Sequence, residues 1–154
     1  MTDLTGQAAP DFSLPASGGQ TVSLADYAGK PVVLFFYPKA DTSGCTKEAV
    51  GFTEAKAEFE AAGAALIGIS KDPVKKQDKF ADKHSLGMPL MSDEEGDVSE
   101  RYGVWKEKQM YGKTYMGIER STFLIGPDGK VLQEWRKVKV PGHVEDVLTA
   151  VKGL

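Results

Sequence analysis

Two runs of consecutive apolar residues mark the first half of the chain. Residues 32–37 read Val-Val-Leu-Phe-Phe-Tyr, and residues 65–70 form a second run. Runs of this length without polar alternation are typical of strands buried on both faces of a sheet. Between them, residues 46–62 place apolar side chains near one helical face, and Gly63 supplies a stop. The pattern predicts a strand–helix–strand unit with a right-handed parallel crossover.

Turn and cap residues on either side of this unit predict further elements. Two alternating runs, 11–14 and 20–24, flank the turn residues 17–19 and predict a small N-terminal hairpin. After the second strand, Asp72-Pro73 is expected to open a helix that runs to about His84. Asp72 would be its cap and Pro73 its first helical residue.

The second half of the chain adds shorter signals. They predict a strand at 88–91, a helical turn at 98–102, a strand within 116–125, a turn at 127–129 leading into a strand at 131–135, and a last helix after Pro141-Gly142. The element order suits a mixed β-sheet flanked by helices, which is the thioredoxin-like α/β plan. We expect one domain that spans residues 1–154.

Composition and charge narrow the class of protein. Hydrophobic residues make up 41% and charged residues 27%, which is ordinary for a globular chain. The net charge of −3 argues against nucleic acid as a partner. The first residues show no signal peptide, and the run 32–37 is too short to span a membrane. A single cysteine excludes an internal disulfide and fits a reducing compartment, so we expect a cytoplasmic protein with no membrane partner.

That cysteine, Cys45, follows the strand 32–37 and a polar loop, and it lies at the start of a predicted helix. Ligands of open α/β sheets favour this edge of the sheet. Unpaired N–H groups and the positive end of the helix dipole favour an anion here, and a thiolate is such an anion. A free cysteine is also commonly a small core residue, which is the alternative interpretation. Its position after a polar loop favours the reactive one.

The residues around Cys45 carry a family motif. Pro38, Thr42 and Cys45 match Pro-x-x-x-Thr/Ser-x-x-Cys, the motif of the peroxiredoxins. Further matches are Asp11-Phe12, Phe36-Tyr37-Pro38, Gly44-Cys45-Thr46-Lys47-Glu48, Tyr102-Gly103-Val104-Trp105 and the segment from Gly112 to Ile125. Over nearly its whole length the chain resembles the bacterioferritin-comigratory, or PrxQ, subgroup. The resemblance implies a peroxiredoxin fold and a thiol-dependent peroxidase that reduces hydrogen peroxide and organic hydroperoxides. The sequence contains no Gly-x-Gly-x-x-Gly motif or phosphate-binding loop, so no cofactor is expected.

The resemblance also implies a role for each matching residue. Cys45 would be the peroxidatic cysteine, and the hydroxyl of Thr42 would point at its sulfur and at the bound peroxide. Arg120 would hold a fixed positive charge beside them. Pro38 would pack over the site and exclude water, and Glu48, one helical turn after Cys45, would orient Arg120.

Ionisation of the thiol alone does not explain a peroxidase. An ordinary thiol with a pKa of ~8.5 is already ~3% ionised at pH 7, so full ionisation gains at most ~30-fold. Further acceleration needs donors that bind the lengthening O–O bond more tightly than the ground state. The available donors are Thr42, Arg120 and the N–H groups around Gly44 and Cys45, so these four residues are the predicted peroxide-binding set.

The chain departs from the subgroup in having no second cysteine. Subgroup members carry one five residues after the first, where this chain has Val50, or on the following helix. The resemblance therefore implies a one-cysteine cycle, in which an external thiol reduces the sulfenic acid of Cys45. Thioredoxin, glutaredoxin and a low-molecular-weight thiol are the candidates. We expect a monomer, and a dimer joined by a Cys45–Cys45 disulfide stays open.

Two other function classes stay open at this point. A thioredoxin-like disulfide reductase would need Cys-x-x-Cys, and Thr42 stands at the first of these positions. A chaperone-type binding module would need a large exposed apolar patch, which a sequence does not show. His84 and His143 are the only histidines and form no ligand set with Cys45, so no zinc site is expected.

Overall fold

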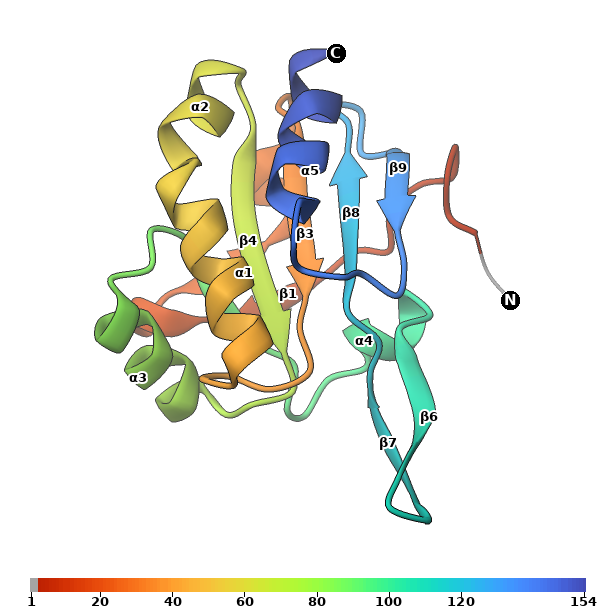
Figure 1. The fold of residues 1–154 in the computed structure, drawn as a ribbon. Coiled ribbons are helices and arrows are strands. Elements are labelled where there is room, and N and C mark those ends of the chain that lie inside the picture. Colours follow the sequence, from red (N-terminus) through yellow and green to blue (C-terminus); the bar gives the residue numbers. More distant parts are fainter. Residues whose placement is uncertain (1–2) are drawn as a thin grey trace.

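Five strands form the central sheet of the computed structural model, which describes residues 3–154 (Figure 1). In spatial order they are β5 (Leu90–Ser92), β4 (Ala65–Ser70), β3 (Val32–Phe36), β8 (Ser121–Ile125) and β9 (Val131–Trp135). Strand β3 pairs in parallel with β4 and antiparallel with β8, so the sheet is mixed. The predicted thioredoxin-like α/β plan is confirmed.

Helices and a small hairpin cover the two faces of this sheet. One face carries α1 (Ser43–Glu54), α2 (Lys56–Ala61) and α5 (His143–Lys152), which stand in front of the sheet in Figure 1. Helix α3 (Val74–His84) follows β4. The other face is covered by the predicted N-terminal hairpin, β1 (Ser13–Pro15) and β2 (Thr21–Ser23), and by α4 (Val98–Arg101). Short 3₁₀ turns at Ser17–Gly19 and Leu24–Tyr27 flank β2.

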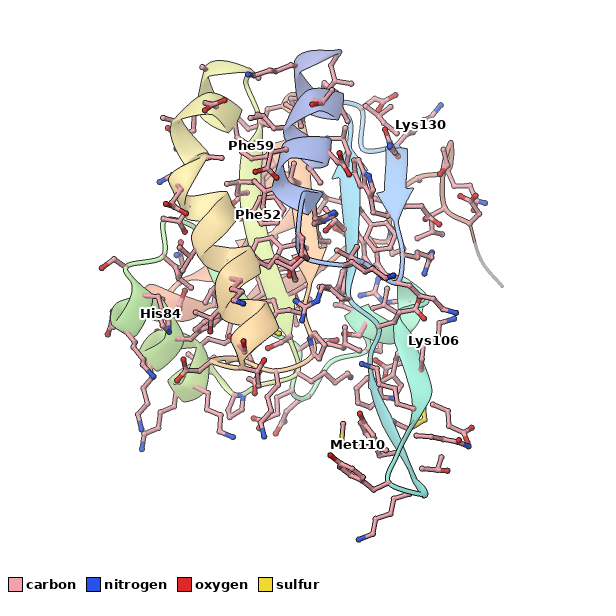
Figure 2. The ribbon with its side chains drawn as sticks, in the orientation of Figure 1. Phe52, Phe59, His84, Lys106, Met110 and Lys130 are labelled. Atoms are coloured by element: carbon pink, nitrogen blue, oxygen red, sulfur yellow. The ribbon has the colours of Figure 1, made fainter. Side chains whose placement is uncertain are left out.

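The predicted burial of β3 on both faces is confirmed, and its side chains divide between two clusters. Odd-numbered positions of the strand belong to the cluster beneath α1, α2 and α5, whereas even-numbered positions pack with the N-terminal hairpin and α4. Phe52 and Phe59, labelled in Figure 2, are fully buried in the first cluster. Phe35 and Phe52 stack with ring centroids 4.7 Å apart. Helix α1, which carries Cys45, is therefore fixed to the middle of the sheet.

The helix predicted at 46–62 starts earlier and is divided. Helix α1 begins at Ser43 with Thr42 as N-cap, and it ends before Ala55, whose φ of −91° and ψ of 0° depart from helical values. Helix α2 continues from Lys56. Because of the earlier start, Cys45 is the third residue of α1 and lies within its first turn.

The predicted cap of the following helix is wrong. Pro73 is extended, with φ −65° and ψ 157°, and is itself the N-cap of α3. The carboxylate of Asp72 is used elsewhere: it accepts hydrogen bonds from the backbone N–H of Ala40 at 2.7 Å and from the hydroxyl of Ser70 at 2.6 Å. Asp72 thus fixes the loop that precedes α1 rather than the start of α3.

An antiparallel hairpin, β6 (Trp105–Met110) and β7 (Lys113–Ile118), was missed by the sequence-based assignment. It projects away from the body in Figure 1, and Met110 lies near its tip in Figure 2. Tyr111 and Gly112 form its two-residue turn with φ of 52° and 76°, as type I′ turns require. Strand β7 ends two residues before Arg120. Within residues 3–154, no helix combines the length and the apolar composition needed to cross a membrane.

Candidate active site

The pairing of β3 with β8 brings Cys45 and Arg120 together. Phe36, at the end of β3, pairs with Ser121, at the start of β8. The chain that follows β3 and the chain that precedes β8 therefore meet at one edge of the sheet. Cys45 comes from the first segment and Arg120 from the second, and Nη2 of Arg120 lies 3.3 Å from Sγ of Cys45. Two residues 75 positions apart in the sequence are thus in direct contact.

Glu48 lies one helical turn after Cys45 and contacts the same guanidinium. Its Oε1 accepts a hydrogen bond from Nη1 of Arg120 at 2.8 Å, so Arg120 bridges the carboxylate and the sulfur. Burial raises the pKa of Glu48 to about 7, and the charge of Arg120 and its hydrogen bond offset this only in part. Burial also acts against the charge of Arg120, but Glu48 and Cys45 outweigh it and raise its pKa. Near neutral pH, Glu48 is therefore divided between acid and carboxylate while Arg120 stays charged.

Gly44 leaves room for this guanidinium at the first turn of α1. A Cβ at position 44 would lie 3.1 Å from Nη2 of Arg120. The N–H of Thr46 donates to the carbonyl of Thr42 at 2.8 Å and closes the turn. The N–H groups of residues 43–45 therefore precede the helical hydrogen-bond ladder. The first turn of α1 therefore offers free N–H groups, and Nη2 of Arg120 lies beside it.

Thr42 and Pro38 belong to the loop between β3 and α1. The hydroxyl of Thr42 donates to the carbonyl of Lys39 at 2.8 Å. Its proton is thereby used, and the lone pairs of the oxygen are left to accept the proton of a bound hydroperoxide. Thr42 is exposed and Pro38 half-buried. That Thr42 points at the sulfur and that Pro38 excludes water stay predictions.

Cys45 is 1% exposed and belongs to the apolar cluster beneath α1. Cys45 is therefore as deeply buried as the interpretation as a core residue predicts. That interpretation does not account for the guanidinium at 3.3 Å from the sulfur, because apolar packing needs no charged neighbour.

The hydrogen bonds that fix this loop were not predicted from the sequence. Asp72 follows β4 and binds the N–H of Ala40, while Ser70 links Asp72 to the amide of Gln77 through a 2.8 Å hydrogen bond. The hydroxyl of Tyr37 donates to Gln77 in turn. A signal was present: Asp72 follows a buried strand parallel to β3, and the carboxyl ends of parallel strands meet at the same edge.

A second cation, Lys108 of β6, was also missed. Its ammonium donates to the carbonyl of Ile118, and its stem passes over Gly117, where a Cβ would lie 3.2 Å from Cδ of the lysine. Burial lowers the pKa of Lys108 and the charge of Arg120 lowers it further, whereas Cys45 and Glu119 act in the opposite direction. Lys108 therefore lies within the electrostatic field of the site. No sequence signal marked it, since the hairpin that carries it was not predicted.

Two more polar side chains, His143 and Thr122, are buried and extend the contacts of Glu48. Nε2 of His143, at the start of α5, lies 2.8 Å from Oγ1 of Thr122 and 3.8 Å from Oε2 of Glu48. Burial lowers the pKa of His143 to about 4; the charge of Arg120 acts in the same direction and that of Asp146 against it. The ring is therefore neutral near pH 7, and its contact with Glu48 is not an ion pair.

Glu48 and His143 give protein stability opposite pH dependences. The pKa of Glu48 is about 7 against an ordinary 4.5, so its contribution is present below pH 4.5 and is lost as the pH rises through 7. The pKa of His143 is about 4 against 6.5, so its contribution is present above pH 6.5 and is lost as the pH falls through 4. The two contributions offset each other between pH 4.5 and 6.5.

Replacing either Glu48 or His143 should leave only the pH dependence of stability that the other residue causes. Relative to the unsubstituted protein, the free energy of unfolding of Glu48→Gln should rise with pH between 4.5 and 6.5. That of His143→Gln should fall across the same range, each by up to about 1.4 kcal/mol per pH unit. Urea denaturation at a series of pH values measures both. Slopes of the same sign in the two variants would contradict this account of the buried pair.

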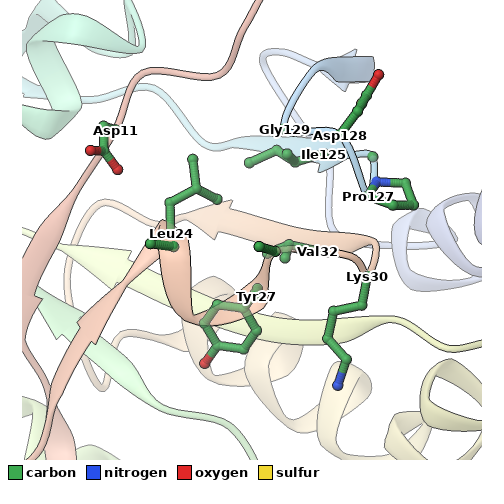
Figure 3. Close-up of a pocket in the computed structure, with 12 residues that line it drawn as sticks. Asp11, Leu24, Tyr27, Lys30, Val32, Ile125, Pro127, Asp128 and Gly129 are labelled. Atoms are coloured by element: carbon green, nitrogen blue, oxygen red, sulfur yellow. The ribbon is translucent and has the colours of Figure 1, made fainter.

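A hollow at the opposite end of the sheet does not belong to the site. Figure 3 shows it between the start of β3, at Val32, and the end of β8, at Ile125, with Tyr27 and Pro127 among its lining residues. Its volume is about 280 Å³. Because Cys45 follows the other end of β3, this hollow is remote from the sulfur. Within residues 3–154, no three His, Cys, Asp or Glu side chains converge as metal ligands would.

The fold and the contact between Cys45 and Arg120 are those expected of a peroxiredoxin, and the comparisons confirm this class of protein. The AhpC/TSA family matches residues 5–134. The chain therefore belongs to the AhpC/TSA family, and it is a thiol-dependent peroxidase.

Individual relatives narrow the assignment. Peroxiredoxin Bcp of Bacillus subtilis (strain 168) is 48% identical over 154 residues, which is 100% of this chain and 98% of the relative. The structure of Xanthomonas campestris peroxiredoxin Q has a TM-score of 0.88 and 47% identity, and the match covers 92% of this chain and 90% of that one. A structure of the X. campestris bacterioferritin comigratory protein, with the same TM-score and coverage and 46% identity, was determined to study alkyl peroxide reduction. Within the family, the chain is a peroxiredoxin of this Bcp, or PrxQ, group.

Proposed function

We propose that the chain reduces hydrogen peroxide and organic hydroperoxides through Cys45, and that an external thiol completes a one-cysteine cycle. The observation that carries this proposal is the 3.3 Å contact between Nη2 of Arg120 and Sγ of Cys45, in the first turn of α1. A guanidinium held against a buried sulfur stabilises a thiolate there. The relative studied for alkyl peroxide reduction supports the same class of substrate.

The chemistry requires a bond exchange at sulfur. The thiolate of Cys45 attacks one peroxide oxygen, the O–O bond breaks, and the second oxygen leaves as hydroxide or alkoxide and takes up a proton. The sulfur is oxidised by two electrons to a sulfenic acid, and the peroxide is reduced to water or an alcohol. Arg120 and the N–H groups of the first turn stabilise the charge that develops on the breaking bond. Glu48 holds Arg120 in the required orientation.

The reducing half of the cycle depends on a second molecule, because the chain contains one cysteine. A thiol attacks the sulfenic sulfur, releases water and forms a mixed disulfide, which a second thiol then cleaves. Thioredoxin, glutaredoxin and low-molecular-weight thiols all provide this chemistry, and all are available in the cytoplasm, the compartment that we propose. A monomer suffices for this cycle.

Peroxide consumption with each reductant in turn tests the proposal. Hydrogen peroxide and an alkyl hydroperoxide are supplied with thioredoxin and its reductase, with glutaredoxin and glutathione, or with a low-molecular-weight thiol alone. Turnover with at least one of these systems is the expected result. Protein that consumes neither peroxide with any of them, or that reduces insulin disulfides instead, would overturn the proposal.

Thr42→Val removes the hydroxyl and keeps the shape of the side chain, so it should show what the hydroxyl contributes to the rate. We expect kcat/KM for hydrogen peroxide to fall about tenfold, because the peroxide loses the oxygen that accepts its proton. Thr42→Ser, which keeps the hydroxyl, should stay within about threefold of the unsubstituted protein. Stopped-flow kinetics on both variants measures the difference. If valine and serine give equal rates, the hydroxyl has no part in the reaction.

A further inference from the structure

A pocket lined by lysines lies between α3 and the loop that leads from β3 to α1. Its volume is about 570 Å³, and residues 39–41 of the loop and residues of α3 between 76 and 83 line it. In Figure 1 this loop runs beside α3 before it reaches the start of α1. Small-molecule sites have volumes of roughly 300–1,000 Å³. The lysine pocket therefore has the size of a site for a small ligand.

The lysine pocket is positively charged, although the chain has a net charge of −3. Four lysines and two aspartates line it, so two positive charges are in excess. Three of the lysines are three or four residues apart on α3 and therefore share one face of the helix. These three are Lys76, Lys79 and Lys83, and the fourth, Lys39, belongs to the loop. A concave surface with this excess of cations favours an anionic ligand.

Most of these lysines have no anionic partner. Lys83 is bound to Asp41 at 2.9 Å, so that carboxylate is already used. For Lys39, Lys76 and Lys79, no carboxylate of residues 3–154 lies within ion-pair distance. A small ligand that carries carboxylates would supply the missing partners.

The lysine pocket is close to the reactive sulfur along the chain and through the packing. Asp41, in its lining, is four residues before Cys45, so their Cα atoms are at most about 14 Å apart. Phe80, also in the lining, belongs with Cys45 to the apolar cluster beneath α1, and Ala40 packs against this cluster. An extended tripeptide spans about 10 Å. A ligand of that size, bound by its carboxylates in the pocket, therefore covers most of the distance to the sulfur.

We propose that the external thiol of the one-cysteine cycle is a small anionic thiol whose carboxylates bind in the lysine pocket. This inference rests on the proposed function and names the class of its reductant. The thiol attacks the sulfenic sulfur of Cys45, the hydroxyl group takes up the thiol proton and leaves as water, and a mixed disulfide forms. A second thiol cleaves this disulfide, which restores the thiol of Cys45 and releases the reductant as its disulfide.

A matched pair of thiols tests the role of the carboxylates. Glutathione carries two carboxylates, and its diethyl ester presents the same thiol without them. Protein oxidised with one equivalent of hydrogen peroxide is mixed with either thiol, and mass spectrometry follows the mixed disulfide at Cys45. Per thiolate, glutathione should react about tenfold faster than the ester, and added salt should reduce this preference. Equal rates, or reduction by thioredoxin alone, would overturn the proposal.

Substitutions in the lysine pocket locate the effect. In the double variant Lys76→Gln/Lys79→Gln, the preference for glutathione over its ester should fall to about twofold or less, because glutamine suits the helix but carries no charge. Lys75→Gln is the matched control, since Lys75 is an exposed lysine of the same helix that does not line the pocket. It should keep the full preference. A double variant with the same preference as Lys75→Gln would contradict the proposal.

Binding without reaction separates the lysine pocket from the proposed function. S-methylglutathione keeps both carboxylates but has no thiol, and its titration into the reduced protein is followed by amide NMR. Signals of residues 39–41 and 76–83 should shift, and the double variant should lose these shifts. Such shifts in a protein without peroxidase activity would remove the proposed function and leave an anion site. Peroxidase activity without such shifts would leave the function and remove the pocket as the site of the reductant.

Discussion

Replacing Cys45 by serine is expected to abolish peroxide reduction, with a loss of about 10⁴-fold or more in kcat/KM. The serine hydroxyl is not ionised near neutral pH, and oxygen does not form the equivalent of a sulfenic acid. No other cysteine is present to replace it. Peroxide consumption with the best external thiol measures the loss.

The same variant should keep the fold, because serine has nearly the size of cysteine. Cys45 is buried beside Arg120, so a hydroxyl at this position still finds a donor. We expect the free energy of unfolding to change by about 1 kcal/mol or less. A folded Cys45→Ser protein with normal activity would mean that the reactive group lies elsewhere.

Replacing Arg120 by methionine has the second largest expected effect. Methionine fills similar space but donates no hydrogen bond, so both the sulfur and the breaking O–O bond lose their cation. We expect kcat/KM to fall about 10²- to 10³-fold. Arg120→Lys should recover only part of this, because one ammonium does not bridge Sγ at 3.3 Å and Oε1 of Glu48 at 2.8 Å as a planar guanidinium does.

The loss of Arg120 also leaves the carboxyl of Glu48 buried without its cation. Arg120→Met should therefore be less stable at high pH, where Glu48 would have to ionise, and its loss should be smaller at low pH. Adding Glu48→Gln should restore stability but not activity. Arg101→Met is a suitable control, since Arg101 forms an exposed ion pair with Asp97 on the surface. Restored activity in the double variant would show that Arg120 serves only to neutralise Glu48.

The parts of the fold with a one-dimensional signal could be predicted from the sequence. Strand β3 lies within the six-residue apolar run 32–37, and β4 lies in a second such run, so the parallel pair and its crossover helix could be predicted directly. The N-terminal hairpin and the last helix carried turn residues at their ends. In each case the signal was local: a continuous apolar run, an apolar helical face or a cluster of turn residues.

The β6–β7 hairpin could not be predicted in this way. Most of its residues are exposed or half-buried, so neither strand shows an apolar run or a clean alternation. Its turn, Tyr111-Gly112, lacks the Asn-Gly or Asp-Gly sequence that marks most type I′ turns. The start of α1 was missed by three residues, because Ser43 and Gly44 are poor helix formers whose conformation is set by the loop before them.

The residues of the site also divide into those that a local sequence pattern indicates and those that it does not. Cys45 was singled out because it follows a strand and a polar loop, whereas Thr42 was singled out through the family motif. Arg120 and Glu48 came from the family resemblance, and no sequence pattern places a guanidinium 3.3 Å from a sulfur 75 residues away. His143 was dismissed as a metal ligand, and nothing in the sequence showed that α5 would bring it to Glu48. Such long-range contacts depend on the pairing of β3 with β8 and on the packing of α5.

The central claim is that the sulfur of Cys45, held by Arg120, is the group that reacts with peroxide. Its most direct test is a single turnover with one equivalent of hydrogen peroxide, stopped with a reagent that traps sulfenic acids and analysed by mass spectrometry. The account predicts a single oxidised site, Cys45, and formation of its sulfenic acid about 10²-fold or more slower in Arg120→Met. Oxidation that falls on methionines instead, or equal rates at Cys45 with and without Arg120, would contradict it.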